Sequence, residues 1–342
     1  MSVSRVASPE RAELVKRALT LDDYVAGVRA GERVTLARAI TLVESTAVAH
    51  TRLAHQLLER LSSHTGGARR IGITGPPGAG KSTLIDSLGT RLTVAGHRVA
   101  VLAVDPTSGR TGGSLLGDKT RMSRLSVDPN AFIRPSPTAG TLGGVARKTR
   151  ESILLCEAAG YDVVLVETVG VGQSETAVHS MVDCFLVLLL AGSGDELQGL
   201  KKGIIELADL IAITKADGDN QSRAERTRVD YQRALEYLTA SEDGWKVPVL
   251  TISSKTGDGV EALWRTVESH RAAGLANGSF ASRRSAQARD WMRSLLDEQL
   301  RARFLAQPGI AERLRELEAQ VTGGELAPEI AVERLLMTSE AG

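Results

Sequence analysis

A glycine-rich stretch, Gly75-Pro-Pro-Gly-Ala-Gly-Lys-Ser82, limits the folds open to this chain more than any other feature of its sequence. It follows an apolar run at residues 71–74 and opens a helical pattern at residues 82–94. Glycines let backbone N–H groups turn inward around a phosphate, because bulky residues are excluded at the backbone angles that this requires. Lys81 would reach the β- and γ-phosphates, and the Ser82 hydroxyl would bind Mg²⁺. The stretch predicts a nucleoside triphosphate site formed by Gly75, Gly78, Ala79, Gly80, Lys81, Ser82 and Thr83.

Short apolar runs alternate with helical segments from Arg69 onward, which is typical of a parallel sheet with helices on both faces. Six runs predict strands, at residues 71–74, 99–104, 163–166, 184–190, 210–213 and 248–252. We therefore expect an α/β fold of the P-loop NTPase type, with a mostly parallel sheet sandwiched by helices. Ligands of such sheets bind beyond the carboxyl ends of the strands, so the residues that follow each run are the candidate site.

The length of 342 residues suits one core domain with appendages. Residues 1–66 predict an N-terminal helical extension, with one helix from residue 21 and a helical pattern at 34–61, and residues 67–275 predict the P-loop domain. Charged amphipathic helices follow, at residues 276–342. Because the sheet already has enough helices for both faces, we interpret them as a dimerisation arm; the alternative is packing on the sheet.

Composition argues against several classes of function. The net charge of +1 gives no reason to expect nucleic acid or an acidic membrane surface as a partner. Cys156 and Cys184 lie in apolar segments, which predicts buried, inert thiols in a reducing compartment. Residues 1–20 lack the apolar core of a signal peptide, and the apolar run at 184–191 is too short to span a bilayer. We expect a cytoplasmic protein with no membrane or nucleic-acid partner.

Acids follow two of the predicted strands. Asp105 comes directly after residues 99–104, with Asp118 in the glycine-rich segment beyond it, and Glu167 comes after residues 163–166. Carboxylates at strand ends beside a bound nucleotide hold Mg²⁺ directly or through water, although Asp105 by itself could equally cap a turn. Gly170, three residues after Glu167, could offer its N–H to the γ-phosphate. The predicted metal ligands are Ser82, Asp105, Asp118 and Glu167.

The candidate catalytic residues are Lys81, Glu167, Gly170 and Lys201. Nucleotide switches that hydrolyse GTP unaided often place a water-orienting Gln directly after the glycine, where this chain has Val171. We therefore hypothesise that intrinsic hydrolysis is slow, and that a partner or a rearranged loop completes the site. Lys201 lies on the ligand side of the sheet and could supply a cation in the transition state; the alternative is a solvated helix face.

Residues Thr214-Lys215-Ala216-Asp217 follow the fifth run and resemble the NKxD motif with which GTPases bind guanine. The Asp217 carboxylate would accept hydrogen bonds from the ring N–H and the exocyclic amine of guanine, which adenine does not offer. Lys215 would lie across the base plane with its aliphatic stem. Ser253-Ser254-Lys255, after the last run, fits the companion loop beside the guanine oxygen. Thr214 replaces the usual Asn, which predicts weaker nucleotide affinity but the same preference for GTP over ATP.

Five motifs together resemble the MeaB/ArgK-type GTPases, which accompany adenosylcobalamin-dependent acyl-CoA mutases. They are GPPGAGKST, AVDPTS…TGGSLLGDKTRM, FIRPSP…GTLGGVA, ETVGVGQSE and GDELQGLKKG. The resemblance extends over roughly residues 22–293 and is most specific in GGSLLGDKTRM and ETVGVGQSE. It implies a GTPase with GTP/GDP and Mg²⁺ as cofactors, which gates the loading of adenosylcobalamin into a mutase such as methylmalonyl-CoA mutase and protects that enzyme.

The resemblance also implies roles for individual positions. Lys81 and Ser82 fall on phosphate and Mg²⁺, Asp217 falls on guanine, and residues 195–202 form a third switch that responds to the mutase. The metal–water network would contain Asp105, Asp118 and Glu167. A homodimer through the C-terminal helices is the common family arrangement, in agreement with the dimerisation arm.

Two other functions fit a phosphate loop. A metal-delivery GTPase for a nickel enzyme would need Cys or His clusters for its cargo, which this sequence lacks. A small-molecule kinase would need an acceptor pocket and would have no use for Asp217. The identity of the mutase, among methylmalonyl-, isobutyryl-, ethylmalonyl- and 2-hydroxyisobutyryl-CoA mutase, is open from the sequence.

Overall fold

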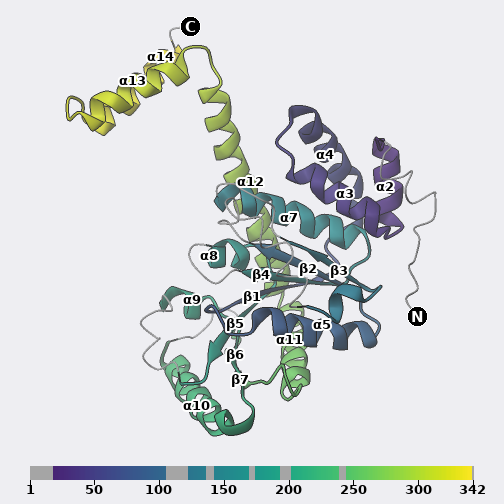
Figure 1. The fold of residues 1–342 in the computed structure, drawn as a ribbon. Helices are drawn as coiled ribbons and strands as arrows, with labels where there is room; N and C mark the ends of the chain where they lie inside the picture. Colours follow the sequence, from purple (N-terminus) through teal and green to yellow (C-terminus); the bar gives the residue numbers. More distant parts are fainter. Residues whose placement is uncertain are drawn as a thin grey trace. The chain divides into compact units, whose positions relative to one another are not determined.

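The structure, a computed structural model, describes residues 18–104, 122–135, 142–168, 174–192, 202–238 and 244–340 (Figure 1). The chain divides into two compact units, Met1–Phe280 and Ala281–Gly342. The first unit contains the sheet and the N-terminal helices, and the second contains most of the C-terminal helices.

The first unit is built on a seven-stranded parallel sheet with the strand order β3-β2-β4-β1-β5-β6-β7. The strands are β1 (Arg69–Thr74), β2 (Val99–Val104), β3 (Ala131–Arg134), β4 (Val163–Thr168), β5 (Cys184–Leu190), β6 (Leu210–Thr214) and β7 (Val249–Thr251). All seven run in the same direction, so their carboxyl ends meet at one edge of the sheet. The α/β fold with a parallel sheet between helices is confirmed.

Helices cover both faces of the sheet, as successive residues of one strand show. In β4, Val163 and Leu165 belong to the core beneath α5 (Lys81–Val94) and α11 (Val260–Ala276), whereas Val164 and Val166 belong to the opposite core. Strands buried on both faces need apolar side chains at every position, which explains the continuous apolar runs in the sequence. The opposite core also contains residues of α7 (Leu142–Ala158), α8 (Ser174–His179), α9 (Lys202–Glu206) and α10 (Gln221–Leu238).

The prediction of six strands was incomplete, because the sequence pattern did not reveal β3. This strand has only four residues, lies at the edge of the sheet beside β2, and buries only its first two residues, Ala131 and Phe132. A short edge strand with one buried end has no apolar run that would distinguish it from a loop. The predicted end of β4 at residue 166 was also too early, because the strand continues to Thr168.

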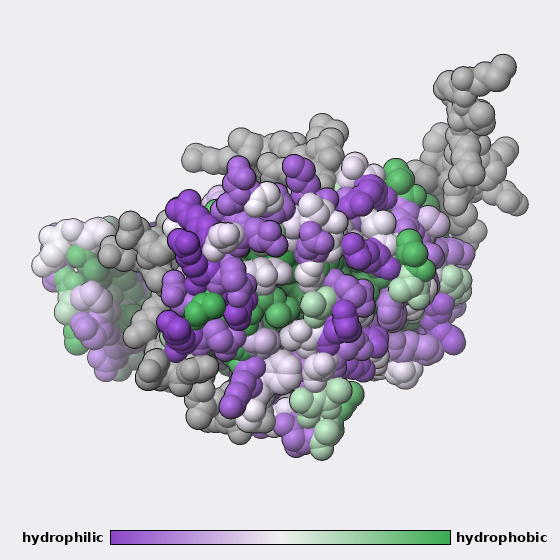
Figure 2. Space-filling model, turned by 90° about the horizontal axis from the view of Figure 1, so that it is seen from below, coloured by the Kyte–Doolittle hydropathy of each residue, from purple (hydrophilic) through white to green (hydrophobic). Residues whose placement is uncertain are grey.

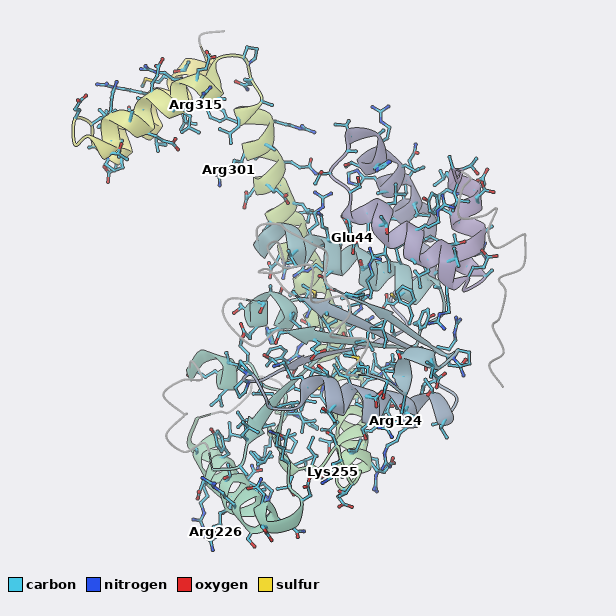
Figure 3. All side chains as sticks on the ribbon, viewed as in Figure 1. Glu44, Arg124, Arg226, Lys255, Arg301 and Arg315 are labelled. Atoms are coloured by element: carbon cyan, nitrogen blue, oxygen red, sulfur yellow. The ribbon has the colours of Figure 1, made fainter. Side chains whose placement is uncertain are left out.

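The helical pattern at residues 34–61 forms two helices instead of one, α3 (Arg33–Glu44) and α4 (Val48–Leu61). Ser45 has an extended backbone with ψ of 143°, and its hydroxyl accepts a hydrogen bond from the Ala47 N–H, so the chain turns between the helices. With α2 (Leu21–Arg29), these helices pack against each other and α7, and share one apolar core with the sheet (Figure 1). Glu44, labelled in Figure 3, connects α3 to Arg134 of β3 through a salt bridge.

A short segment after β2 packs on the helix that follows the phosphate loop. The Asp86 carboxylate in α5 accepts hydrogen bonds from the backbone N–H groups of Arg124 and Leu125, and Arg124 adds a side-chain bond (Figure 3). Gly89, one turn further along α5, is in close contact with Leu125, where a Cβ would come within 2.6 Å of a Leu125 methyl group. These contacts fix residues 122–125 beside α5.

The C-terminal unit consists of three helices, α12 (Ser279–Leu305), α13 (Ile310–Thr322) and α14 (Pro328–Glu340). The amphipathic helices predicted in residues 276–342 are confirmed. Several large apolar side chains are exposed along α12 and α14: Met292, Leu296, Leu300, Ile330, Val332, Leu336 and Met337. None of the helices in the described part of the chain is both long and apolar enough to cross a membrane.

Candidate functional site: a nucleotide site at the carboxyl edge of the sheet

The phosphate loop connects β1 to α5, at the carboxyl edge of the sheet. Gly75 could not be replaced without distortion, because a Cβ at this position would come within 2.5 Å of the Leu188 carbonyl oxygen of β5. Gly80, directly before α5, has a φ of +86°, which favours glycine. The Lys81 ammonium donates hydrogen bonds to the carbonyl oxygens of Gly75 (2.8 Å) and Pro76 (3.3 Å), and the side chain is buried. The loop therefore curls around the lysine that was predicted to bind phosphate.

Ser82 and Glu167, two of the predicted metal ligands, are in direct contact. The Ser82 hydroxyl donates a hydrogen bond of 2.8 Å to Glu167 Oε1, and Glu167 is 8% exposed. Glu167 lies within β4 and pairs with Ile73 of β1, so the acid belongs to the strand rather than to the turn after it. A hydroxyl and a carboxylate oxygen are hard ligands of the kind that Mg²⁺ prefers, so this pair fits a magnesium site.

Two threonines support this contact from within the sheet. Thr168, the residue after Glu167, donates a hydrogen bond of 2.8 Å to the hydroxyl of Thr74 at the end of β1. Both threonines are fully buried. The bond joins the ends of β1 and β4 directly beneath the phosphate loop. These residues were not among the predicted site residues, because a threonine at the end of an apolar run gives no sign of its partner on another strand.

The residues predicted to bind guanine lie after β6 and β7, on the same edge of the sheet. The Ser253 hydroxyl, which is fully buried, donates a hydrogen bond of 2.5 Å to Asp217 Oδ2. The Thr256 N–H in turn donates to the Ser253 hydroxyl. Ser254 and Lys255 follow, and Lys255 is exposed and labelled in Figure 3. The two predicted loops thus form one connected unit.

Thr214 stands where the guanine motif usually has Asn, and it is the last residue of β6. Its hydroxyl donates a hydrogen bond of 3.1 Å to the Leu189 carbonyl oxygen of β5, and the side chain is buried. Because the hydroxyl proton is donated to the sheet, the Thr214 oxygen can only accept a hydrogen bond from another group. Lys215 follows, with an exposed side chain and a φ of +56°.

The predicted site residues come together in two groups. Ser82 and Glu167 contact each other beside Lys81, and Asp217 contacts Ser253. The strands that carry these groups are β4 and β1 on one side, and β6 and β7 on the other, with β5 between them. Among the other predicted phosphate-loop residues, Ala79 is buried and Thr83 is exposed on α5. Asp105, Asp118, Gly170, Val171, residues 195–201 and hence Lys201 lie outside the described residues.

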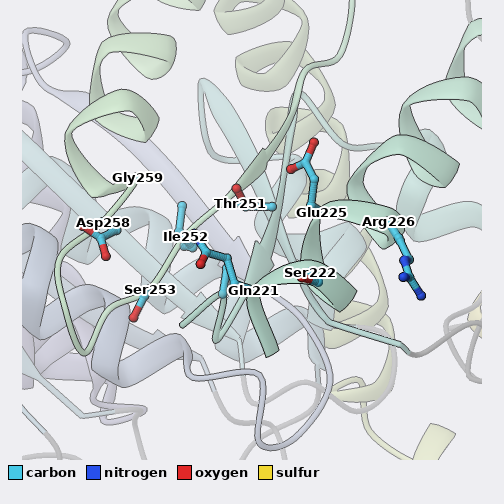
Figure 4. A pocket seen from close by; sticks show the side chains of 10 residues that line it. Gln221, Ser222, Glu225, Arg226, Thr251, Ile252, Ser253, Asp258 and Gly259 are labelled. Atoms are coloured by element: carbon cyan, nitrogen blue, oxygen red, sulfur yellow. The ribbon is translucent and has the colours of Figure 1, made fainter. Parts of the chain in front are cut away.

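A pocket of about 640 Å³ lies on the outer side of the guanine loops, between the N-terminus of α10 and the edge strand β7 (Figure 4). It is lined by Ala216 from the first loop, Ser253 from the second, and Gln221 and Ser222 from α10. Seen from below, where α10, β7 and α11 lie in Figure 1, the surface is mostly hydrophilic, with apolar residues visible in a hollow near its centre (Figure 2). The pocket therefore adjoins both guanine loops.

Both cysteines are buried, as the sequence predicts. Neither Cys156 nor Cys184 forms a disulfide bond with another described residue. Burial is the main cause that raises the pKa of the Cys156 thiol far above its ordinary value, so the thiolate is not formed near neutral pH. This thiol is therefore inert.

Comparison with known proteins agrees with this geometry. The family model described as methylmalonyl Co-A mutase-associated GTPase MeaB matches residues 36–309. A Caulobacter vibrioides protein named as a GTPase is 57% identical over 319 residues, which cover 93% of this chain and 98% of that protein. The mitochondrial methylmalonic aciduria type A homolog of Mus musculus is 48% identical over 326 residues, covering 92% of this chain and 79% of that protein.

A solved structure, titled as that of an LAO/AO transport system kinase, has a similar fold. Its TM-score is 0.76 at 38% sequence identity, and the match covers 95% of this chain and 100% of that chain. The family model extends over most of the chain and includes the phosphate loop and both guanine loops. The chain therefore belongs to the MeaB family of methylmalonyl-CoA mutase-associated GTPases, and it is a GTPase that binds guanine nucleotides.

Proposed function

We propose that this GTPase is the chaperone of an adenosylcobalamin-dependent acyl-CoA mutase of the methylmalonyl-CoA mutase type. It gates the loading of intact adenosylcobalamin into the mutase and protects the mutase from inactivation. The observation that carries the proposal is the match of residues 36–309 to a family described by its association with methylmalonyl-CoA mutase. Similarity over most of the chain to a methylmalonic aciduria type A homolog adds support.

The proposed mechanism assigns the phosphates to the loop between β1 and α5. Lys81 gives up its bonds to the carbonyl oxygens of Gly75 and Pro76 and binds the β- and γ-phosphates. Ser82 and Glu167 would hold Mg²⁺, which would supply positive charge to stabilise the phosphates. Charge stabilisation of this kind supplies most of the rate of phosphoryl transfer.

The base is assigned to the loops after β6 and β7. Asp217 accepts from the ring N–H and the exocyclic amine of guanine, while Ser253 fixes the orientation of its carboxylate through their hydrogen bond. The stem of Lys215 covers one face of the base, and Ser254 and Lys255 lie at the guanine oxygen. ATP would leave the Asp217 carboxylate without the two donors that guanine offers, which is the source of the discrimination.

Four further assignments complete the proposed site. Asp105 and Asp118 join the metal–water network, Gly170 donates its N–H to the γ-phosphate, and Lys201 supplies a cation in the transition state. With Val171 in the position of the water-orienting Gln, hydrolysis without a partner is slow. The mutase complex completes the catalytic site. If it does so by supplying a cation, hydrolysis accelerates by about 10³–10⁵-fold.

The C-terminal unit is proposed to bind a second copy of the chain. Met292, Leu296 and Leu300 follow one another at intervals of four residues on α12, and each is more than half exposed. A helix of a soluble unit rarely exposes such a stripe without a partner. Leu296→Glu is expected to convert the dimer into monomers in a light-scattering measurement, whereas Glu298→Ala on the same helix leaves the mass unchanged.

A co-purification experiment tests the proposed partner. The purified protein is mixed with methylmalonyl-CoA mutase in the presence of GDP or of a non-hydrolysable GTP analogue, and complexes are separated by gel filtration. We expect a nucleotide-dependent complex, and a mutase that retains activity longer when the GTPase and GTP are present. Absence of a complex with any acyl-CoA mutase in both nucleotide states would overturn the proposal, and GTP-dependent phosphorylation of a small molecule would favour a kinase.

A further inference from the structure

The loop between β6 and α10 contains an unusual backbone conformation at the centre of the guanine site. Lys215 has a φ of +56°, and among the described residues it is the only non-glycine residue with a positive φ. A side chain disfavours this left-handed region, so surrounding contacts must hold the residue there. Because the conformation sets the directions of Lys215 and Asp217, whatever holds it also aims these two side chains.

Asn220 supplies these contacts from within the same loop. Its side-chain amide donates a hydrogen bond of 2.7 Å to the Lys215 carbonyl oxygen. Its backbone N–H donates to the Asp217 carbonyl oxygen at 3.2 Å. Asn220 is thus bonded at both ends of the tripeptide that would face the base.

Other contacts hold the middle of the loop. Ala216 is buried in the core, and it lines the pocket of about 640 Å³ together with Gln221 and Ser253. Hydrogen bonds also connect the loop to the end of β7, from the Ala216 N–H to the Ile252 carbonyl oxygen and from the Ser253 hydroxyl to Asp217. Among the described residues, the hydrogen bond to the Lys215 carbonyl oxygen comes from Asn220.

We propose that Asn220 is a positioning residue for guanine recognition, which holds Lys215 in its left-handed conformation and so aims Lys215 and Asp217 at the base. The inference rests on the proposed guanine contacts of these two residues. It also explains how the loop is held although Thr214 replaces the usual Asn. The Thr214 hydroxyl is bonded to the Leu189 carbonyl oxygen of the sheet. The Asn220 amide bonds the loop instead, at the Lys215 carbonyl oxygen.

The first test compares Asn220→Ala with Asp219→Ala. Asp219 is exposed, lies in the same loop, and has no hydrogen-bond partner among the described residues, so it is a matched control. Loss of one hydrogen bond predicts that Asn220→Ala weakens GDP binding by about 3- to 10-fold, mainly through faster dissociation. Asn220→Asp, which has the same shape but cannot donate, is expected to be at least as weak. Asp219→Ala should bind GDP like the wild type.

Two readouts separate aiming from a general structural role. Inosine triphosphate lacks the exocyclic amine that Asp217 would bind, so a misaimed Asp217 predicts a smaller preference for GTP over inosine triphosphate in Asn220→Ala. The second readout uses Lys215→Gly, because glycine adopts a positive φ without strain. In the Lys215→Gly background, Asn220→Ala should change the rate of GDP dissociation by less than about twofold. Glycine at position 215 adopts the positive φ without strain, so the Asn220 hydrogen bond is no longer needed to hold it.

These measurements distinguish a positioning role of Asn220 from a general structural role. An unchanged GTP preference in Asn220→Ala, or an equal loss of affinity in the wild-type and Lys215→Gly backgrounds, would overturn the positioning role. The same holds if Asp219→Ala weakens binding as much as Asn220→Ala does. A wild-type protein with no preference for GTP over inosine triphosphate would instead show that the guanine contacts are wrongly assigned. The melting temperature of each nucleotide-free variant confirms that it is folded.

Discussion

The Ser82 hydroxyl donates a hydrogen bond of 2.8 Å to the Glu167 carboxylate, from the first turn of α5 to the next-to-last residue of β4. The two residues are 85 positions apart in the sequence and come together because β1 and β4 are neighbours in the sheet. The bond joins the residue after the phosphate-loop lysine to β4. If Ser82 binds another group, it no longer donates this hydrogen bond, and the Glu167 carboxylate loses this contact.

Glu167→Gln is expected to impair hydrolysis through Mg²⁺. The amide keeps the shape of the side chain but removes its charge, so GTP hydrolysis should fall by about 10²–10³-fold. The Mg²⁺ concentration for half-maximal activity should rise, while GDP affinity measured without Mg²⁺ changes little. Phosphate release measured over a range of Mg²⁺ concentrations checks this, with Glu225→Gln on α10 as a control. An unchanged Mg²⁺ dependence would remove Glu167 from the metal site.

Asp217→Asn should change the base that the protein prefers. The amide can no longer accept from the guanine amine, but it can donate to the oxygen that xanthine carries at that position. We expect GTP affinity to fall by more than about 100-fold and xanthosine triphosphate binding to appear. Competition with a fluorescent nucleotide measures both. If the variant and the wild type used ATP equally well, the guanine assignment would be wrong.

Thr214→Asn tests the departure from the usual motif. An amide at the end of β6 can bond the sheet and the nucleotide together, whereas the Thr214 hydroxyl has a single proton, which goes to Leu189. One added hydrogen bond predicts that GDP binds about 3- to 10-fold more tightly. Thr214→Val, which removes the hydroxyl, should not tighten binding. Isothermal titration of the two variants distinguishes a gain at the nucleotide from a general effect on β6.

Glu157→Gln is expected to destabilise the first unit. The Glu157 carboxylate pairs with Arg70 at 2.8 Å and accepts a hydrogen bond from the Gly66 N–H, and the carboxylate is almost completely buried. Removing one charge of a buried pair leaves the other uncompensated, so the free energy of unfolding should fall by about 3–5 kcal/mol. Urea denaturation measures this. Glu225→Gln, which breaks an exposed pair with Arg228, should leave the midpoint almost unchanged.

Tyr231→Phe predicts a stability difference that depends on pH. The buried Tyr231 hydroxyl has no hydrogen-bond partner among the described residues, and burial raises the pKa of the phenol above its ordinary value near 10. Above that value the unfolded state loses its proton first, so the wild type loses stability as pH rises through 10 toward the folded pKa. The variant should lose less stability than the wild type there, and should be at least as stable at pH 7. Urea midpoints at pH 7 and 10.5 check both expectations.

The sequence alone identified the features whose chemistry is local. The phosphate loop has its glycines, lysine and serine within eight consecutive positions, so their spacing was sufficient. The long apolar runs predicted six strands because a strand buried on both faces is apolar at every position. The guanine motif was recognisable despite Thr214, because Lys215 and Asp217 keep their spacing to the end of the strand.

Only the tertiary structure decided which distant residues meet. The strand order places β1 between β4 and β5, which brings Ser82 to Glu167, while the pairing of β6 with β7 brings Asp217 to Ser253. Local patterns could not reveal β3 at the edge of the sheet. They also could not show that Asn220 restrains Lys215, since an asparagine in a polar loop looks the same whether or not its amide is bonded. Contacts between segments depend on the packing of the whole sheet. They therefore cannot be predicted from the residues that adjoin each position in the chain.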